Sequence, residues 1–436
     1  MKMRHLWMIL MMLILVTSCF SAFAADKVTT LQLQFSMVGD PPAQTLRQLV
    51  SQYEKLHPNI KIEVSYVPWE NHRSVTISKL VSGNPPDILH SATSQGAVEY
   101  ANMGVLTDLK PYLKQDPKFF NDFIPSTFKE LNYQGLPFVQ SPEAVIFYRK
   151  DLFKEAGIPF PTVDKPWSWD EFIKYAQKLT ADQDKDGVID RWGFVDRGQS
   201  GFIFMKSTIP LIWSFGADVV RKSNNKWVSG FDTPQAKRFV QFYVDLTRKY
   251  KVRPESYLGW GFAEGLRAWK EGKVAMFGVG AWFADSIQQN TDMRFNEEWD
   301  VMLYPTAPGA KKFFYQTLDY YMIPKASKQK KEAWNFLKWM YEKEQLIAMA
   351  KADFDLAPAR KSVLADPYYS PQNKPLYGSR LAIWAEDSKF MPLCPEYSVV
   401  WTGIVEPILQ SAVLGKITVN EAISRLNTEI NKKLKK

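Results

Sequence analysis

The feature that most constrains the fold is a strand and helix rhythm that begins near the N-terminus. Apolar residues alternate at 31–35 and 60–66, helical patterns follow at 43–56 and 69–81, and a short apolar run comes at 87–89. This order predicts a parallel sheet flanked by helices. Ligands of such sheets bind outside the carboxyl ends of the strands, so the loops at 37–40 and 90–95 are candidate binding loops.

The same rhythm recurs after Tyr148, and it predicts a second α/β lobe. Helices are expected at 168–179, 234–250 and 265–270, a strand at 274–279, a long amphipathic helix at 328–349 and a terminal helix at 419–434. The 436 residues also exceed what one hydrophobic core usually serves. We place 25–140 and about 317–355 in an N-terminal lobe, and about 141–316 and about 356–436 in a C-terminal lobe.

The first 24 residues are typical of a secretory signal peptide. Basic residues at Lys2 and Arg4 precede an apolar run from Leu6 to Val16, which is shorter than the roughly 20 residues of a membrane-spanning helix. Two processing routes are open: cleavage after Ala24, or lipidation at Cys19. We therefore expect an exported protein, either periplasmic or tethered to the membrane as a lipoprotein.

The amino-acid composition limits which covalent bonds and which classes of binding partner are expected. Without Cys19 the only remaining cysteine is Cys394, so we expect no internal disulfide. The net charge of +9 comes from scattered residues and is weak support for nucleic-acid binding. The 15 tryptophans are more informative, because flat indole faces suit the apolar faces of sugar rings.

Several motifs occur in the order found in one protein family. They are SGNPPDI at 82–88, GVLTDL at 104–109, the segment 133–153, PWSWDEF at 166–172, GKVAMFGVGAW at 272–282, AWNFL at 333–337 and the segment 391–401. Together they resemble the family 1 extracellular solute-binding proteins, and more closely the maltodextrin- and sugar-binding members. The resemblance covers the chain from about residue 31 to its end.

The resemblance implies a fold and a function. The fold is the type II periplasmic-binding-protein fold, with two lobes of mostly parallel sheet that are joined by crossing strands near 138–144 and 315–320 and close as a hinge. The function is capture of a mono- or oligosaccharide in the interlobe cleft and delivery to an ABC importer. The partners would be permease subunits of the inner membrane, and the chain would be a monomer that needs no cofactor and catalyses no reaction.

The resemblance also nominates polar ligand contacts. Asp40 matches an acceptor for sugar hydroxyls, although an Asp before two prolines also suits a helix cap. Glu143 matches an acidic contact in the crossover, or a residue that stabilises the hinge. His90 and Ser91 end the third strand, where some relatives carry an aromatic contact that this chain lacks. Arg360 resembles a hydroxyl-binding arginine, and a surface salt bridge is the alternative.

Aromatic contacts come from tryptophans. Relatives place a sugar-stacking Trp at the position of Trp282 and a second one at the position of Trp401. Trp260, Trp69 and Trp384 are further candidates, and core packing explains these three equally well.

A separate acidic motif suggests a structural calcium site. Asp182, Asp184, Asp186 and Asp190 have the spacing of oxygen ligands in an EF-hand-like loop, but position twelve is Gly193 where a bidentate Glu is expected. Weak calcium binding and a plain Asp-rich turn both remain open.

Other ligands and another protein class fit parts of the sequence. Within the same family the ligand could be an acidic sugar, a glycerol-phosphate ester or a polyamine. A secreted carbohydrate-active enzyme would need two carboxylates around the scissile bond, for which Asp40 and Glu143 are the only candidates. The chain contains no Gly-x-Ser-x-Gly, His-Glu-x-x-His or phosphate-loop motif, which disfavours catalysis.

Overall fold

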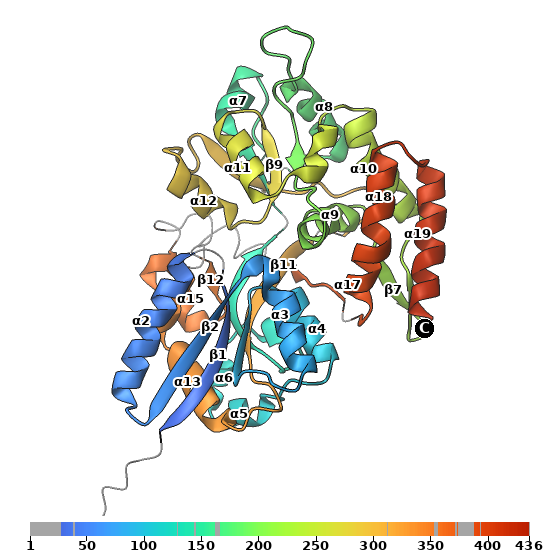
Figure 1. The fold of residues 1–436 in the computed structure, drawn as a ribbon. Coiled ribbons are helices and arrows are strands. Elements are labelled where there is room, and N and C mark those ends of the chain that lie inside the picture. Colours follow the sequence, from blue (N-terminus) through green and yellow to red (C-terminus); the bar gives the residue numbers. More distant parts are fainter. Residues whose placement is uncertain are drawn as a thin grey trace, which may run out of the picture.

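The computed structural model describes residues 28–37, 40–128, 130–143, 145–161, 166–311, 313–352, 356–370, 373, 388–392 and 394–435. The expected leader with Cys19, residues 38–39 of the first binding loop and Trp384 lie outside these ranges, as does the side chain of Trp69. The described residues form two α/β lobes, drawn one above the other in Figure 1. Each lobe has its own large hydrophobic core, which confirms the prediction of two α/β lobes.

The first lobe is built on a mixed sheet. Its strands are ordered β12 (Ala357–Pro358), β4 (Leu136–Pro142), β11 (Phe314–Met322), β3 (Ile88–Ser91), β1 (Thr29–Met37) and β2 (Ile60–Pro68), and β13 (Ser388–Lys389) pairs with β11. As the sequence rhythm requires, β1 runs parallel to β2 and β3. In contrast, β11 runs antiparallel to β3 and β4 because it enters this sheet from the other lobe.

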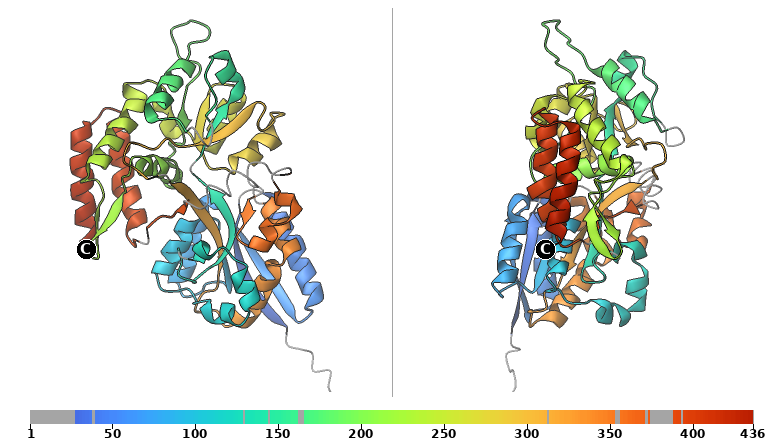
Figure 2. Two further views of the ribbon diagram at one scale, coloured as in Figure 1. Left: turned by 180° about the vertical axis from the view of Figure 1, so that it is seen from behind. Right: turned by 90° about the vertical axis from the view of Figure 1, so that its right-hand side faces the viewer.

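Helices cover both faces of this sheet. Figures 1 and 2 place α3 (Trp69–Val81) and α4 (Ser94–Asn102) on one side, and α2 (Asp40–Leu56) and α13 (Lys330–Met340) on the other. The remaining short elements are α5 (Lys110–Lys114), α6 (Pro117–Asn121), η1 (Pro125–Phe128), α14 (Lys343–Ala352), α15 (Lys361–Leu364) and η3 (Pro367–Tyr369).

The second lobe contains a four-stranded sheet and a hairpin. The sheet order is β10 (Trp299–Leu303), β5 (Val145–Arg149), β9 (Met276–Val279) and β6 (Val195–Asp196). β6 and β9 are parallel, whereas β5 is antiparallel to both of its neighbours. Both sheets are therefore more mixed than the mostly parallel sheets expected from the sequence. The hairpin consists of β7 (Val220–Ser223) and β8 (Lys226–Ser229).

Helix ends in this lobe follow the capping residues of the sequence. α8 (Trp169–Leu179) begins with a capping box formed by Ser168 and Glu171, and Thr233 caps α10 (Pro234–Arg248). The other helical elements are α7 (Lys150–Glu155), α9 (Phe202–Ser214), η2 (Glu255–Gly259), α11 (Phe262–Lys270), α12 (Phe283–Asn290), α17 (Tyr397–Val400), the π-helical turn η6 (Trp401–Val405), α18 (Glu406–Val413) and α19 (Val419–Leu434). Among the described helices, none has the length and apolar character that a membrane crossing needs.

Two of the connections between the lobes run through strands that the structure describes. The chain leaves the first lobe through β4 and enters the second through β5, and it returns along β11. The two ends of β11 belong to different cores, because Tyr315 packs in the second lobe and Tyr321 in the first. These crossings agree with the positions expected near 138–144 and 315–320.

The structure differs from the sequence prediction in where the chain re-enters the second lobe. We expected this near residue 356, but β12 pairs with β4 and Val363 and Tyr369 pack in the first core. Residues 356–370 therefore belong to the first lobe. Sequence periodicity carried no information on this boundary, because the deciding contact is with a strand more than 200 residues earlier.

The long helix expected at 328–349 is also divided, into α13 and α14. The break falls at Tyr341 and Glu342, between the two helices. The Arg360 guanidinium donates to the Tyr341 carbonyl, and the Tyr341 hydroxyl donates to the Leu136 carbonyl at 2.9 Å. The first bond satisfies a backbone carbonyl at the break that a continuous helix would otherwise satisfy itself, and the second anchors the Tyr341 side chain to β4.

Candidate functional site

Trp282 occupies the turn between β9 and α12, at the boundary between the lobes. Its indole packs against the hydrophobic cores of both lobes. Gly280 lets the backbone approach closely, since a Cβ there would lie 2.2 Å from Trp282 Nε1 and 2.7 Å from Glu143 Oε2. Any larger residue would push these two groups apart. The Gly-Ala-Trp sequence of the turn therefore holds the indole beside Glu143.

Glu143 is a buried carboxylate in the crossover from β4 to β5. The Lys206 Nζ of α9 lies 2.7 Å from its Oε1. Thr317 Oγ1 of β11 lies 3.4 Å from Oε1, and Trp282 Nε1 lies 3.5 Å from Oε2. A buried charge is tolerated when it is paired and hydrogen-bonded. Glu143 thus ties both crossing segments to the second lobe.

Arg197 follows β6 and lies over the Trp282 ring, with its guanidinium carbon 5.0 Å from the ring centroid. The residue is 6 % exposed, and its Nε is buried without a hydrogen-bond partner among the described residues. Burial lowers the pKa of Arg197, and the nearby Glu143 carboxylate opposes this shift. The contact with the indole supplies only part of the stabilisation that a buried cation needs.

A second buried ion pair supports the strand end that carries Arg197. Asp196 and Arg253 are fully buried and meet at 2.8 Å. The Arg253 guanidinium also lies between the rings of Tyr243 and Tyr257, with its central carbon 4.5 and 3.8 Å from their centroids. This packing fixes the carboxyl end of β6, where parallel strands present ligand-contacting residues.

The boundary between the lobes therefore combines an aromatic face with several charged groups and a hydroxyl. Trp282 and Glu143 were expected there from the sequence. Lys206, Arg197 and Thr317 were not, although Arg197 could have been found by applying the rule about strand carboxyl ends to the second lobe. The other two gave no sequence signal, because only the fold brings them to Glu143. The ligand roles of Trp282 and Glu143 remain predictions.

His90 lies inside the first lobe and is 1 % exposed. Its ring stacks on Phe35 with centroids 4.5 Å apart and lies tilted 4.7 Å from the Tyr321 ring, and both ring nitrogens lack a hydrogen-bond partner among the described residues. Burial, with a smaller contribution from His72, lowers the pKa of His90 to about 3. In this structure the imidazole is a neutral member of an aromatic cluster and offers no accessible donor to a sugar.

The other polar candidates of the first lobe do not join the group around Glu143. The Ser91 hydroxyl is buried and donates to the Thr93 carbonyl at 2.9 Å. Asp40 is exposed in the first turn of α2, and no hydrogen bond or ion pair of the described residues joins it to Glu143. Arg360 pairs with Asp122 at 2.7 Å. Asp40 thus stands at a helix start and Arg360 in a salt bridge, and the ligand roles of both remain predictions.

The remaining tryptophan candidates lie in the second lobe. Trp401 is 0 % exposed and packs in the hydrophobic core, 6.0 Å from the Phe204 ring. It has no free face for a sugar in this conformation, because η6 turns it inward. Trp260 is partly buried, and its carbonyl accepts from the Gln199 amide at 3.0 Å, close in sequence to Arg197. Trp260 therefore remains a candidate and Trp401 is a core residue here.

Three of the four predicted calcium ligands come together. Ligand oxygens of Asp182, Asp184 and Asp190 all lie within 4.8 Å of one another. Asp186 turns away and accepts from the Val188 amide at 2.7 Å. The cluster is partly held by its own backbone bonds, such as the one from Gly187 to Asp182 at 2.8 Å. These oxygens suit calcium chemically, and the geometry leaves its binding an expectation.

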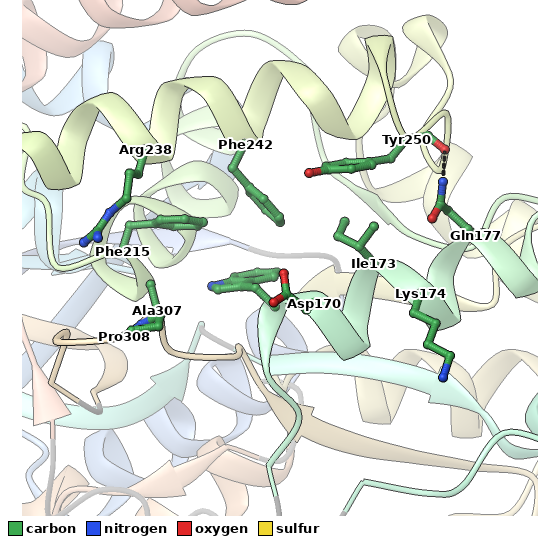
Figure 3. Close-up of a pocket in the computed structure, with 11 residues that line it drawn as sticks. Asp170, Ile173, Lys174, Gln177, Phe215, Arg238, Phe242, Tyr250, Ala307 and Pro308 are labelled. Atoms are coloured by element: carbon green, nitrogen blue, oxygen red, sulfur yellow. Dashed lines mark hydrogen bonds between the residues drawn. The ribbon is translucent and has the colours of Figure 1, made fainter.

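A separate hollow of about 420 Å³ lies on the second lobe, between α8 and α10 (Figure 3). Figure 3 shows the apolar side chains of Phe215, Phe242 and Ile173 between the two helices, with Arg238 and Lys174 toward opposite sides. None of its lining residues belongs to the group around Glu143. All of its lining residues belong to the second lobe, so closure of the two lobes would not enclose a ligand in this hollow.

Comparison with known proteins identifies the family of the chain and agrees with its two-lobe fold. The model of the family described as bacterial extracellular solute-binding protein matches residues 39–347. An uncharacterized lipoprotein of the oleD 5′ region of Streptomyces antibioticus is 27 % identical over 365 residues, which are 82 % of this chain and 76 % of that protein. Among solved structures, a solute-binding protein from Thermotoga lettingae bound with α-D-tagatose gives a TM-score of 0.77 at 21 % identity and covers 93 % of this chain and 100 % of its own. The maltose-bound MalE3 of T. maritima gives a TM-score of 0.75 at 22 % identity, covering 92 % and 98 %.

Proposed function

Because the chain belongs to the bacterial extracellular solute-binding proteins, we propose that it captures a carbohydrate between its two lobes and presents it to an ABC importer. The observation that carries this proposal is the position of Trp282, which packs against both lobes beside buried charged groups. An indole can stack on a sugar ring while charged groups bond to its hydroxyls. Two structural neighbours hold tagatose and maltose, which supports the same class of ligand.

The crossing strands couple ligand binding to closure of the two lobes. A ligand that touches both lobes favours the closed arrangement over the open one, and it can shift the equilibrium only by its difference in affinity for the two. Glu143 and Thr317 lie on the two crossing segments, and Lys206 belongs to the second lobe. A sugar bonded to this group would therefore contact both crossing segments and could favour the closed arrangement of the lobes. The importer would preferentially bind the closed, ligand-bound form.

Thermal unfolding of the mature protein against a broad sugar panel tests this function. A ligand that binds only the folded protein raises the melting temperature. We expect a rise with at least one carbohydrate and its loss in Trp282→Ala. Trp227→Ala is the matched control, because Trp227 is also partly buried under a cation, Lys222 at 5.1 Å, but lies on the β7–β8 hairpin. Absence of saturable binding across the panel would refute the proposal.

Export and processing belong to the same proposal. The leader supports a periplasmic protein or one tethered through lipidated Cys19, and the relative from S. antibioticus is named as a lipoprotein. Mass spectrometry of the mature N-terminus distinguishes the two routes, since a diacylglyceryl group on Cys19 and a free Ala25 differ in mass. Permease subunits of the inner membrane would be the partners of the loaded monomer.

Binding without turnover separates this function from a carbohydrate-active enzyme. Glycoside hydrolysis needs two carboxyl groups about 5 to 10 Å apart around the bond. Glu143 is committed to Lys206 at 2.7 Å, and Asp40 is exposed at the start of α2. We expect a bound oligosaccharide to be recovered intact after prolonged incubation with the protein. Appearance of shorter products in proportion to protein concentration would favour the enzyme.

A further inference from the structure

We propose that the captured carbohydrate carries a negatively charged group, a carboxylate or a phosphate, and that Arg197 binds it. This inference rests on the proposed function and specifies its substrate class. It starts from the position of Arg197 at the carboxyl end of β6, over the indole of Trp282 at the boundary between the lobes.

Arg197 differs from the other well-buried arginines of the described residues. Each of those has a carboxylate partner within 3.3 Å: the pairs are Arg149 with Asp151, Arg191 with Glu155, Arg253 with Asp196, and Arg360 with Asp122. Arg197 is only 6 % exposed, yet its side chain takes part in no ion pair or hydrogen bond with another described residue, and its Nε is buried without a hydrogen-bond partner. Burying a cation in this way is costly unless something else supplies the counter-charge.

Glu143 and Asp196 act electrostatically on Arg197, but each is already the ion-pair partner of another cation. Glu143 lies 2.7 Å from Lys206, and Asp196 lies 2.8 Å from Arg253. Each of these pairs is neutral as a unit. Arg197 therefore adds one positive charge that the group of neighbouring ion pairs does not balance. A ligand with one negative charge would balance it, whereas a neutral sugar or a polyamine would not.

The geometry of the guanidinium also favours an anion. Its planar fork donates parallel bonds to carboxylate or phosphate oxygens, and such bonds are stronger than bonds to neutral hydroxyls. Because this fork covers one face of Trp282, a sugar ring that contacts the rest of the indole would place an attached acidic group within reach of Arg197. The aromatic ring and the cation thus recognise two parts of one acidic sugar.

Calorimetric titration of the mature protein with matched pairs of sugars tests the inference. Glucuronate and galacturonate, with their disaccharides, are compared with the corresponding neutral sugars, and glucose 6-phosphate and glucose 1-phosphate form the phosphate arm. We expect one acidic arm to bind at least about 10-fold more tightly than its neutral counterpart, because bonds to charged groups contribute about 1.5 to 3 kcal/mol. Preference for uronates or for phosphates identifies which anion is bound.

Two substitutions connect the preference to Arg197. Arg197→Gln should weaken the acidic sugar by about 10- to 100-fold, and Arg197→Lys should restore part of the affinity without the fork geometry. Arg191→Gln is the matched control, since Arg191 is equally buried but bonded to Glu155 and the Leu179 carbonyl. The control should lower the melting temperature and leave the affinity unchanged. Arg197→Gln should keep or raise the melting temperature of the ligand-free protein, because it removes an unbalanced buried charge.

The outcomes separate the inference from the function on which it rests. Tight binding of a neutral sugar, with no gain from an acidic group, would overturn the inference and leave carbohydrate capture intact. Binding of putrescine or spermidine in place of sugars, or of no compound at all, would overturn both. Unchanged affinity for an acidic sugar in Arg197→Gln would also overturn the inference, as would a loss of melting temperature as large as that of Arg191→Gln.

Discussion

The ion pair beneath the candidate site gives a quantitative prediction. Asp196→Asn removes the carboxylate that meets Arg253 at 2.8 Å, and both side chains are 0 % exposed. Breaking a buried pair from one side costs roughly 3–5 kcal/mol, because the remaining charge is left without a partner. Arg253 keeps its bonds to the Thr247 hydroxyl at 3.1 Å and the Tyr243 carbonyl at 2.9 Å. We therefore expect the lower end, about 3 kcal/mol.

Thermal and urea unfolding of the ligand-free protein measure this loss. For a lobe of this size, each kcal/mol lowers the melting temperature by roughly 2–4 °C, so Asp196→Asn should lower it by roughly 6–12 °C. Asp232→Asn is the control, because Asp232 pairs with Arg221 at 2.7 Å with both side chains substantially exposed. The pair between Asp232 and Arg221 should contribute no more than about 1 kcal/mol to the free energy of unfolding.

The double variant Asp196→Leu with Arg253→Met separates charge from packing. Replacing a buried pair by apolar residues is often close to neutral, so the double variant should be more stable than Asp196→Asn alone. Equal losses in Asp196→Asn and Asp232→Asn would refute the reasoning, since burial would then make no difference. A double variant less stable than the single one would show that the pair holds the fold through geometry that apolar side chains do not replace.

Three further outcomes are expected. Burial lowers the pKa of His90 to about 3 from 6.5, so the unfolded state binds more protons than the folded state between these pH values, and the free energy of unfolding falls as the pH is lowered through them. His90→Phe should reduce this loss of stability by roughly 1.4 kcal/mol per pH unit in urea unfolding. Identical pH profiles of the variant and the parent protein would contradict this prediction. Calcium at millimolar concentration should raise the melting temperature by binding to Asp182, Asp184 and Asp190, because a ligand of the folded state stabilises it. We expect no rise in Asp182→Asn or in the presence of excess EDTA. An equal rise in the variant would show that calcium binds elsewhere. Burial raises the pKa of the Cys394 thiol to about 12, so Ellman's reagent should label it only after denaturation, and complete labelling of native protein within minutes would contradict its buried position.

Local sequence signals were enough to predict most of the helices and strands and the broad class of the protein. Alternating apolar residues placed β1 and β2, helical spacing placed α2 and α19, and capping residues such as Ser168 set helix starts, because these signals are local. The resemblance of the ordered motifs was enough to nominate Trp282 and Glu143. Local signals failed at Tyr341, where contacts with distant residues divide a helix that its own sequence would continue.

Which polar groups face one another depends on contacts between residues far apart in the sequence. Lys206 and Glu143 are 63 residues apart, Trp282 and Glu143 are 139 apart, and Arg360 and Asp122 are 238 apart. Burial of a side chain and the pairing of its charge depend on such long-range contacts, which periodicity does not encode. For the same reason the sequence could not separate a core Trp401 from a boundary Trp282, or reveal that the buried Arg197 forms no ion pair with another described residue.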